Sequence, residues 1–144
     1  MNMLLLAIAG LVSVSMFNIA KAQSTVGELL DAGGKALTKD EINSTVGGGS
    51  VAGPTAAGGE GQVEFNANGT MSGWVTNQTG RRGSILGTWT VDDNGKICRD
   101  VAIKFYESAQ VKDCFIFYRL GDKLFVGGGG GGRSGAILPR TVKK

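Results

Sequence analysis

The 144-residue chain contains no histidine and only two cysteines, Cys98 and Cys114. Histidine is the usual general base and the commonest metal ligand, so its absence removes most familiar catalytic and metal-binding arrangements. A serine nucleophile would need a lysine base instead, and no Ser-x-x-Lys motif is present. No glycine cluster ends in the Gly-Lys-Ser/Thr of a phosphate-binding loop. We therefore expect a protein that is not an enzyme and uses no cofactor or metal. A hydrolase that relies on carboxylates alone is the weaker alternative.

The first part of the chain has the pattern of a secretion leader. An apolar stretch over residues 4–17 is followed by Ala20-Lys21-Ala22, which supplies small residues at the −3 and −1 positions of a cleavage site. This pattern predicts a signal peptide over residues 1–22, cleaved after Ala22, and a periplasmic or secreted protein. Met1-Asn2-Met3 carries no Lys or Arg, so an uncleaved N-terminal membrane anchor is the alternative.

An exported chain with two cysteines is expected to carry one disulfide. If residues 96–103 and 109–119 form a hairpin with its turn near Tyr106, Cys98 lies directly opposite Cys114. Directly opposed residues of an antiparallel pair can have Cα atoms about 4.5 Å apart, within the range of a disulfide. The sequence therefore predicts a Cys98–Cys114 bond between neighbouring strands.

Residues 23–60 are expected to form one or two short helices and a glycine-rich loop. Thr25 with Glu28, and Thr38 with Glu41, have the spacing of capping boxes at the starts of helices. The segment 47–60 is rich in Gly and Ala, which is typical of a flexible connector.

From residue 61 the apolar residues alternate with polar ones, as in half-buried strands. Asn68-Gly69 and Asn94-Gly95 are strong signals for two-residue hairpin turns. The pattern predicts a mainly β domain over residues 61–138, an antiparallel meander of six or seven strands that forms a small barrel or half-barrel. A β-sandwich is the alternative. The glycine run 127–132 is interpreted as a flexible connector and residues 139–144 as a solvated basic tail.

The turns also set an expected register. They align Trp89 with Asp100 and place both on the inner face with Cys98, so Trp89 should pack against the disulfide. Trp74 and Tyr118 fall on the same face. These aromatic residues have two interpretations, an ordinary core or the lining of a ligand pocket. Trp74, Trp89, Asp100 and Tyr118 are therefore the candidate ligand-contacting residues.

Phe115 and Phe117 fall on the face opposite Cys114 and must be covered by the N-terminal helices, a partner or the other sheet. We expect an exported, non-enzymatic protein that binds a small or glycan-like ligand or another envelope component. The alternative is a structural or self-associating envelope protein that associates through the Phe115/Phe117 face. A net charge of only +3 does not favour nucleic acid as a partner.

Five segments carry a resemblance to a known family: Leu37–Ile42, Phe65–Thr70, Gly87–Val91, Gly95–Cys98 and Asp113–Phe115. Their order, above all Gly-Thr-Trp, then Gly-Lys-x-Cys, then Cys-Phe, resembles the small secreted proteobacterial proteins called domain of unknown function 995 over about residues 37–126. The resemblance implies export, a β-rich fold and a disulfide. Some members are linked by name to exopolysaccharide production, and no catalytic residues carry over.

Overall fold

The computed structural model describes residues 22–130 and 132–144, so the predicted signal peptide, apart from Ala22, lies outside the described residues. The elements follow in the order α1 (Val26–Asp31), β1 (Lys35–Ala36), α2 (Lys39–Thr45), β2 (Gly49–Pro54), β3 (Glu60–Phe65), β4 (Thr70–Thr76), β5 (Arg82–Val91), β6 (Lys96–Lys104), β7 (Ser108–Leu120), β8 (Lys123–Gly128) and β9 (Ile137–Lys143).

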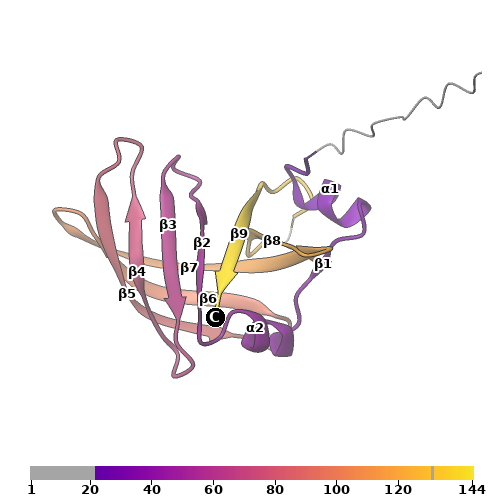
Figure 1. Cartoon of the computed structure of the whole chain (residues 1–144), viewed down its shortest axis with the longest axis horizontal. Coiled ribbons are helices and arrows are strands. Elements are labelled where there is room, and N and C mark those ends of the chain that lie inside the picture. The colour runs from indigo at the N-terminus through magenta and orange to yellow at the C-terminus, as the bar shows by residue number, and fades with distance from the viewer. Residues whose placement is uncertain (1–21, 131) are drawn as a thin grey trace, which may run out of the picture.

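Strands β2 to β9 form a closed antiparallel barrel of eight strands (Figure 1). Each strand pairs with the next along the chain, and β9 pairs with β2 to close the ring. The short strand β1 pairs with β7 beyond the point where the pairing of β6 with β7 ends. The predicted barrel is confirmed, with more strands than the six or seven expected. Closure pairs the edges that an open meander would expose.

Much of the two strands that close the barrel lies in segments that were not expected to be strands. Residues 47–60 were interpreted as a connector and residues 139–144 as a solvated tail, yet Ser50 pairs with Lys143 and Val51 with Val142. The glycine run also begins inside a strand, because Gly127 and Gly128 belong to β8. Backbone hydrogen bonds from both neighbours hold these segments, so a weak side-chain pattern is sufficient to make them strands.

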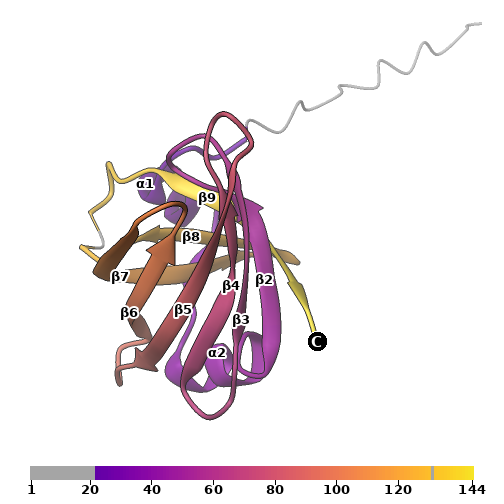
Figure 2. The ribbon, with the colours of Figure 1, turned by 90° about the vertical axis from the view of Figure 1, so that its left-hand side faces the viewer.

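Helix α2 closes one end of the barrel (Figure 2). The predicted capping box is present, with Thr38 and Glu41 each accepting a hydrogen bond from the other's backbone N–H. Ile42 and Val46 are completely buried in the main hydrophobic core. Lys39 forms an ion pair of 3.2 Å with Asp93 in the β5–β6 turn, which places the start of the helix at the same end as that turn. The helix therefore forms a base beneath the barrel.

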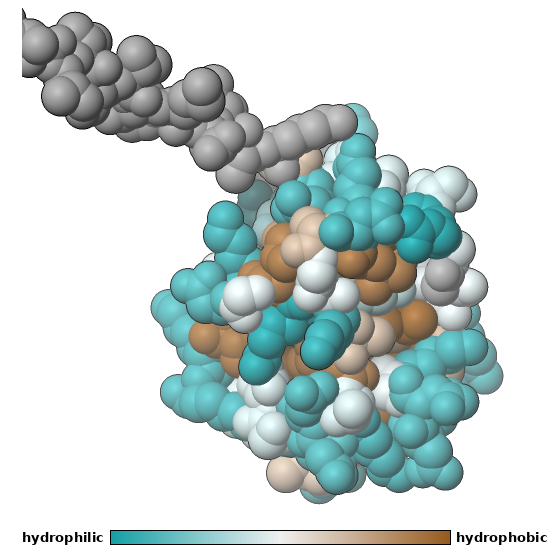
Figure 3. All heavy atoms as spheres, turned by 90° about the vertical axis from the view of Figure 1, so that its right-hand side faces the viewer, coloured by the Kyte–Doolittle hydropathy of each residue, from teal (hydrophilic) through white to brown (hydrophobic). Residues whose placement is uncertain are grey.

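Helix α1 packs outside the barrel. Its capping box, Thr25 with Glu28, is also confirmed. Val26 and Leu29 form a second hydrophobic cluster with residues of β7, β8 and β9, which include Tyr118. Figure 3 views the molecule from this side and shows apolar residues exposed between hydrophilic ones. None of the helices in the described ranges is long and apolar enough to cross a membrane.

Tyr118 gives this outer cluster a dependence on alkaline pH. The side chain is buried, and burial raises the pKa of its hydroxyl above the ordinary value of 10.0. The unfolded chain therefore loses this proton first, and the stability is full below about pH 10 and falls as the pH rises further. We expect Tyr118→Phe to reduce the loss of stability between pH 9 and pH 11, measured by urea unfolding. The matched control is Tyr106→Phe, because Tyr106 is 73% exposed; equal pH slopes in the two variants would contradict the prediction.

The hairpin turns are one residue longer than expected, which changes the register. At Asn66–Thr70 and Asp92–Lys96 the first residue's N–H bonds to the carbonyl of the fifth, so three residues form each loop. The last loop residue, Gly69 or Gly95, has φ of 85° or 80°, as in a type I turn followed by a glycine bulge. Asp92 Oδ1 accepts from two backbone N–H groups in its turn, the role expected of an aspartate there.

Because of this shift, Trp89 pairs with Arg99 and not with Asp100. In the other hairpin the inward Val63 pairs with Gly73, while Trp74 pairs with Gln62. A slip of one residue moves a side chain to the other face of a sheet. Trp74 and Asp100 therefore lie outside the barrel, while Arg99 points inward. The predicted inner positions of Trp74 and Asp100 are wrong for this reason.

Candidate functional site

The barrel contains a cavity of about 810 Å³ above the base that α2 forms. Residues of the loops at the end away from α2, among them Thr55, Asn77 and Phe105, contribute to its lining. Most of the lining is apolar; it includes Val51, Val63, Phe65, Met71, Val75, Ile85, Ile103, Phe115, Phe117, Val126 and Leu138. Gly53 and Gly61 also line it and bring no side chain, so they leave space inside the barrel.

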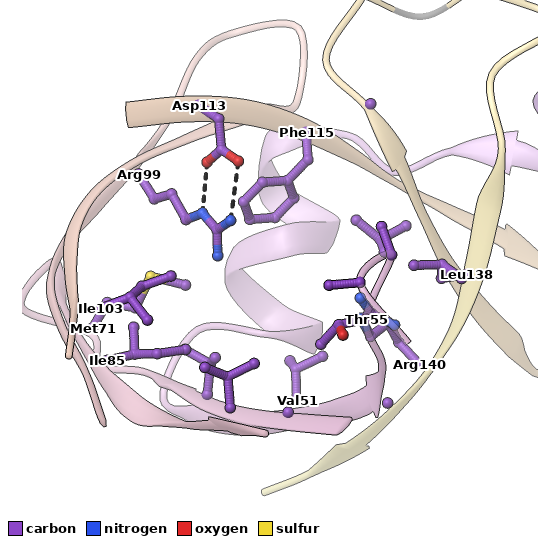
Figure 4. A pocket seen from close by; sticks show the side chains of 18 of the residues that line it. Val51, Thr55, Met71, Ile85, Arg99, Ile103, Asp113, Phe115, Leu138 and Arg140 are labelled. Carbon is purple, nitrogen blue, oxygen red and sulfur yellow. Dashed lines mark hydrogen bonds and ion pairs between the residues drawn. The ribbon is translucent and has the colours of Figure 1, made fainter. Parts of the chain in front are cut away.

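Three charged side chains line this apolar space: Arg99, Asp113 and Arg140. Arg99 on β6 and Asp113 on β7 are direct partners in the register. They form a two-pronged ion pair, with Nε to Oδ1 at 2.6 Å and Nη2 to Oδ2 at 3.0 Å. Figure 4 shows the remaining nitrogen of Arg99 directed away from Asp113 and into the cavity.

Arg140 on β9 approaches from another side of the cavity (Figure 4). Its Nη1 donates to the carbonyl oxygens of Pro54 and Pro139, both at 2.8 Å. Within residues 22–130 and 132–144 no carboxylate lies within ion-pair distance of it. Burial lowers the pKa of Arg140, the negative charge of Glu60 raises it, and the positive charge of Arg99 lowers it further. The side chain remains charged at neutral pH, because a guanidinium group keeps its proton in proteins.

The cavity lining thus has two positive groups and one negative group, which leaves a net charge of +1. The one carboxylate is engaged by Arg99, so the excess positive charge belongs to Arg140 and to the inner side of Arg99. Charges in a space with apolar walls are less screened than charges on an outer surface.

The four residues predicted to contact a ligand do not line this cavity. Trp74 lies outside the barrel, where the guanidinium of Arg82 covers its ring. Arg82 Cζ is 4.1 Å from the centre of the Trp74 ring. Asp100 forms an outer ion pair of 3.2 Å with Lys112. Tyr118 is buried in the cluster under α1. Trp89 points inward as predicted but belongs to the core near the base, where it is 7% exposed.

Phe115 and Phe117 face the interior. Phe117 is 1% exposed, and its ring lies edge-on to those of Phe65 and Phe115 at centroid distances of 6.3 and 5.7 Å. They do lie opposite Cys114, as predicted, but the barrel itself covers them. The Phe115/Phe117 face is therefore not an outer surface for self-association.

The predicted disulfide between Cys98 and Cys114 is confirmed, with an S–S distance of 2.01 Å and the two residues directly opposed in the register. It lies on the outer face, in a shallow depression with Thr88 and Thr90. The prediction that Trp89 packs against it is wrong, because Cys98 pairs with Thr90. Cys98 precedes Arg99 and Cys114 follows Asp113. The bond therefore fixes the two strands at the position where the inner ion pair forms, and it is compatible with an oxidising compartment.

Sequence reasoning missed Arg99, Asp113 and Arg140, although their spacing carries a signal. Arg99 stands two residues from Ile97 and Val101, which are both completely buried. Arg140 likewise stands two residues from Leu138 and Val142, which are half-buried. A charged residue in phase with the apolar alternation of a strand points into the interior.

Comparisons with known proteins gave no match: no family model, no curated protein and no solved structure is similar to the chain. The resemblance to domain of unknown function 995 therefore stays a prediction. In the part of the chain that the structure describes, no group of three or more Cys, Asp or Glu side chains is arranged to hold a metal ion.

Proposed function

We propose that this chain is an exported binding protein that holds one small, mainly apolar molecule inside its barrel. The observation that carries the proposal is the cavity of about 810 Å³, closed at one end by α2. Ligand pockets in proteins have volumes of about 300–1,000 Å³ and mostly apolar walls with a few polar groups. Barrels of eight strands are wide enough inside to hold one small ligand.

The lining favours an alkyl or similar apolar body over a sugar. A glycan needs many hydrogen-bond partners, whereas the hydroxyls of Thr55 and Thr76 in the lining already bond to backbone groups of Gly59 and Glu60. Each methylene group moved from water into such a cavity contributes about 0.8 kcal/mol. An apolar ligand of several carbon atoms therefore gains the most from this site.

The groups at the site also favour binding over catalysis. Asp113 accepts two hydrogen bonds from Arg99, and Arg140 bonds to two backbone carbonyls. General acid–base catalysis needs a proton-transferring group near a nucleophile or a reacting atom. Two guanidinium groups and a carboxylate engaged by one of them are instead suited to orienting a bound molecule.

The proposal predicts that straight-chain alcohols bind with an affinity that rises with their length. We expect hexanol, octanol and decanol to displace a neutral fluorescent naphthylamine probe, with the dissociation constant falling about fourfold per added methylene group. A double variant, Val63→Trp with Ile103→Trp, reduces the cavity from two sides, since both side chains line it. We expect it to weaken decanol binding at least tenfold.

The matched control places the same two tryptophans on the outside of the same strands. Glu64 directly follows Val63 and Ala102 directly precedes Ile103, so Glu64→Trp with Ala102→Trp introduces the same two side chains without entering the cavity. Circular dichroism would confirm that both variants are folded. Equal binding in the two double variants, or no dependence on chain length in the wild type, would contradict the proposal. Stronger displacement by an oligosaccharide would favour a glycan as the ligand.

A further inference from the structure

The cavity contains a positively charged side chain, Arg140, that forms no ion pair with any described residue, although the negative charge of Glu60 acts on it from farther away. Arg140 approaches the cavity from β9, in a space whose other walls are mostly apolar. Removing a charged group from water is costly unless it is paired. Both backbone carbonyls accept from Nη1, which is one of the three nitrogens of the Arg140 guanidinium. No described interaction engages the other two, Nη2 and Nε.

The fold holds this guanidinium in place. A Cβ atom added at Gly53 would lie 2.8 Å from Arg140 Nη1 and 2.5 Å from the carbonyl oxygen of Pro139. Any side chain at position 53 would therefore displace the Arg140 side chain or separate the strands. Because Gly53 has no side chain, the Arg140 side chain can cross β2 at this position and reach the Pro54 carbonyl. The position of the charge thus depends on both strands that close the barrel.

A second guanidinium contributes to the same space. Asp113 holds Arg99 by Nε and Nη2, which leaves Nη1 directed into the cavity (Figure 4). The ring of Phe115 lies beside this group, with its centre 5.7 Å from Arg99 Cζ. The ion pair therefore orients Arg99 and neutralises it, so that the net excess is a single positive charge.

We infer that the ligand of this cavity is an amphiphile with one acidic group, whose apolar body contacts the barrel walls while its carboxylate binds Arg140 and the free Nη1 of Arg99. This inference rests on the proposed function and adds the chemical class of the ligand. Guanidinium groups donate pairs of hydrogen bonds that match the two oxygens of a carboxylate. An anion of charge −1 would neutralise the cavity.

Three probes with the same ten-carbon chain and different head groups test the inference on the unmodified protein at neutral pH. Decanoate carries a negative charge, decanol is neutral, and decylamine is positive. We expect decanoate to bind at least tenfold more tightly than decanol, and decylamine to bind more weakly than decanol. Isothermal titration below the micelle concentration gives the three dissociation constants directly. This comparison needs no variant, so it holds even if a substitution prevents folding.

The variant Arg140→Gln then locates the effect. We expect it to weaken decanoate binding at least tenfold and to leave decanol binding within threefold of the wild type. Arg119→Gln is the matched control, because Arg119 is exposed near the end of β7, where it bonds to Thr45 Oγ1 of α2 and does not line the cavity. Both variants lose one positive charge, so a general effect of net charge would appear in both, whereas a head-group contact appears in Arg140→Gln alone.

Failure of the two proposals would look different. If none of the three probes binds, the proposed function is wrong and the head-group inference fails with it. If decanol binds as tightly as decanoate, or Arg140→Gln changes the binding of both probes equally, the barrel still binds apolar molecules but the acidic head group is excluded. Tighter binding of decylamine would overturn the inference in the opposite direction.

Discussion

The variant Trp89→Ala is expected to lose about 3–5 kcal/mol of its free energy of unfolding, measured by urea denaturation with the disulfide intact. Trp89 is 7% exposed, and its ring lies edge-on to Phe65 at a centroid distance of 5.4 Å. Its Nε1 also donates to the Asn66 carbonyl at 3.0 Å, which joins β5 to the β3–β4 turn. The substitution leaves a large hole beside the base and removes this bond. Domains of this kind have about 5–15 kcal/mol of stability in total, so the variant should be largely unfolded on mild heating.

The second tryptophan of the chain supplies the control. Trp74 lies outside the barrel and contacts Arg82 by its ring face, so Trp74→Ala should cost less than about 1 kcal/mol. A loss below about 1 kcal/mol for Trp89→Ala would mean that the base of the barrel is not tightly packed. Similar losses for both variants would contradict the assignment of the two residues to opposite faces.

Removal of the disulfide is expected to have the next largest effect. Cys98→Ala with Cys114→Ala should lower the free energy of unfolding by about 3 kcal/mol, because the bond closes a loop with a sequence separation of 16 in the unfolded chain. Cys98 is half-buried and Cys114 exposed on the outer face, so two alanines there leave no cavity in the core. The measurement is urea denaturation of the variant beside the oxidised wild type.

Reduction of the wild type provides the control for this prediction. Wild-type protein unfolded in the presence of dithiothreitol should match the double variant, and the reductant should not change the variant. A difference below about 1 kcal/mol between oxidised and reduced wild type would contradict the prediction. Two thiols that react with iodoacetamide in freshly exported native protein would show that the bond does not form in the cell.

The position of the disulfide also links stability to the proposed site. The bond joins β6 and β7 directly beside Arg99 and Asp113. Cys98–Cys114 and Arg99–Asp113 are consecutive pairs in the register of the two strands. Loss of the bond leaves these strands held by their backbone hydrogen bonds, which remain the main constraint on the ion pair. The disulfide therefore adds a covalent link to the one wall of the cavity that β6 and β7 form.

Features set by neighbouring residues could be predicted from the sequence. Thr25 and Thr38 begin the two helices as expected, since a capping box needs only residues three apart. The alternation of residues along β5 places buried Ile85 and Trp89 on one face and Leu86, which is 66% exposed, on the other. The Cys98–Cys114 pairing followed from one hairpin and its turn. In each case the determining contacts lie within one element or one hairpin.

The tertiary structure decided which side of several strands became the interior. A loop of three residues differs from one of two by a single residue, and Asn-Gly is compatible with both. That small difference turned Trp74 and Asp100 outward and Arg99 inward. Nor could a local pattern show that Ser50 meets Lys143, because this pairing joins the first and the last strand of the barrel. The cavity and its unpaired Arg140 exist because these two distant segments meet, which is why the sequence indicated a barrel while only the closed fold revealed the site.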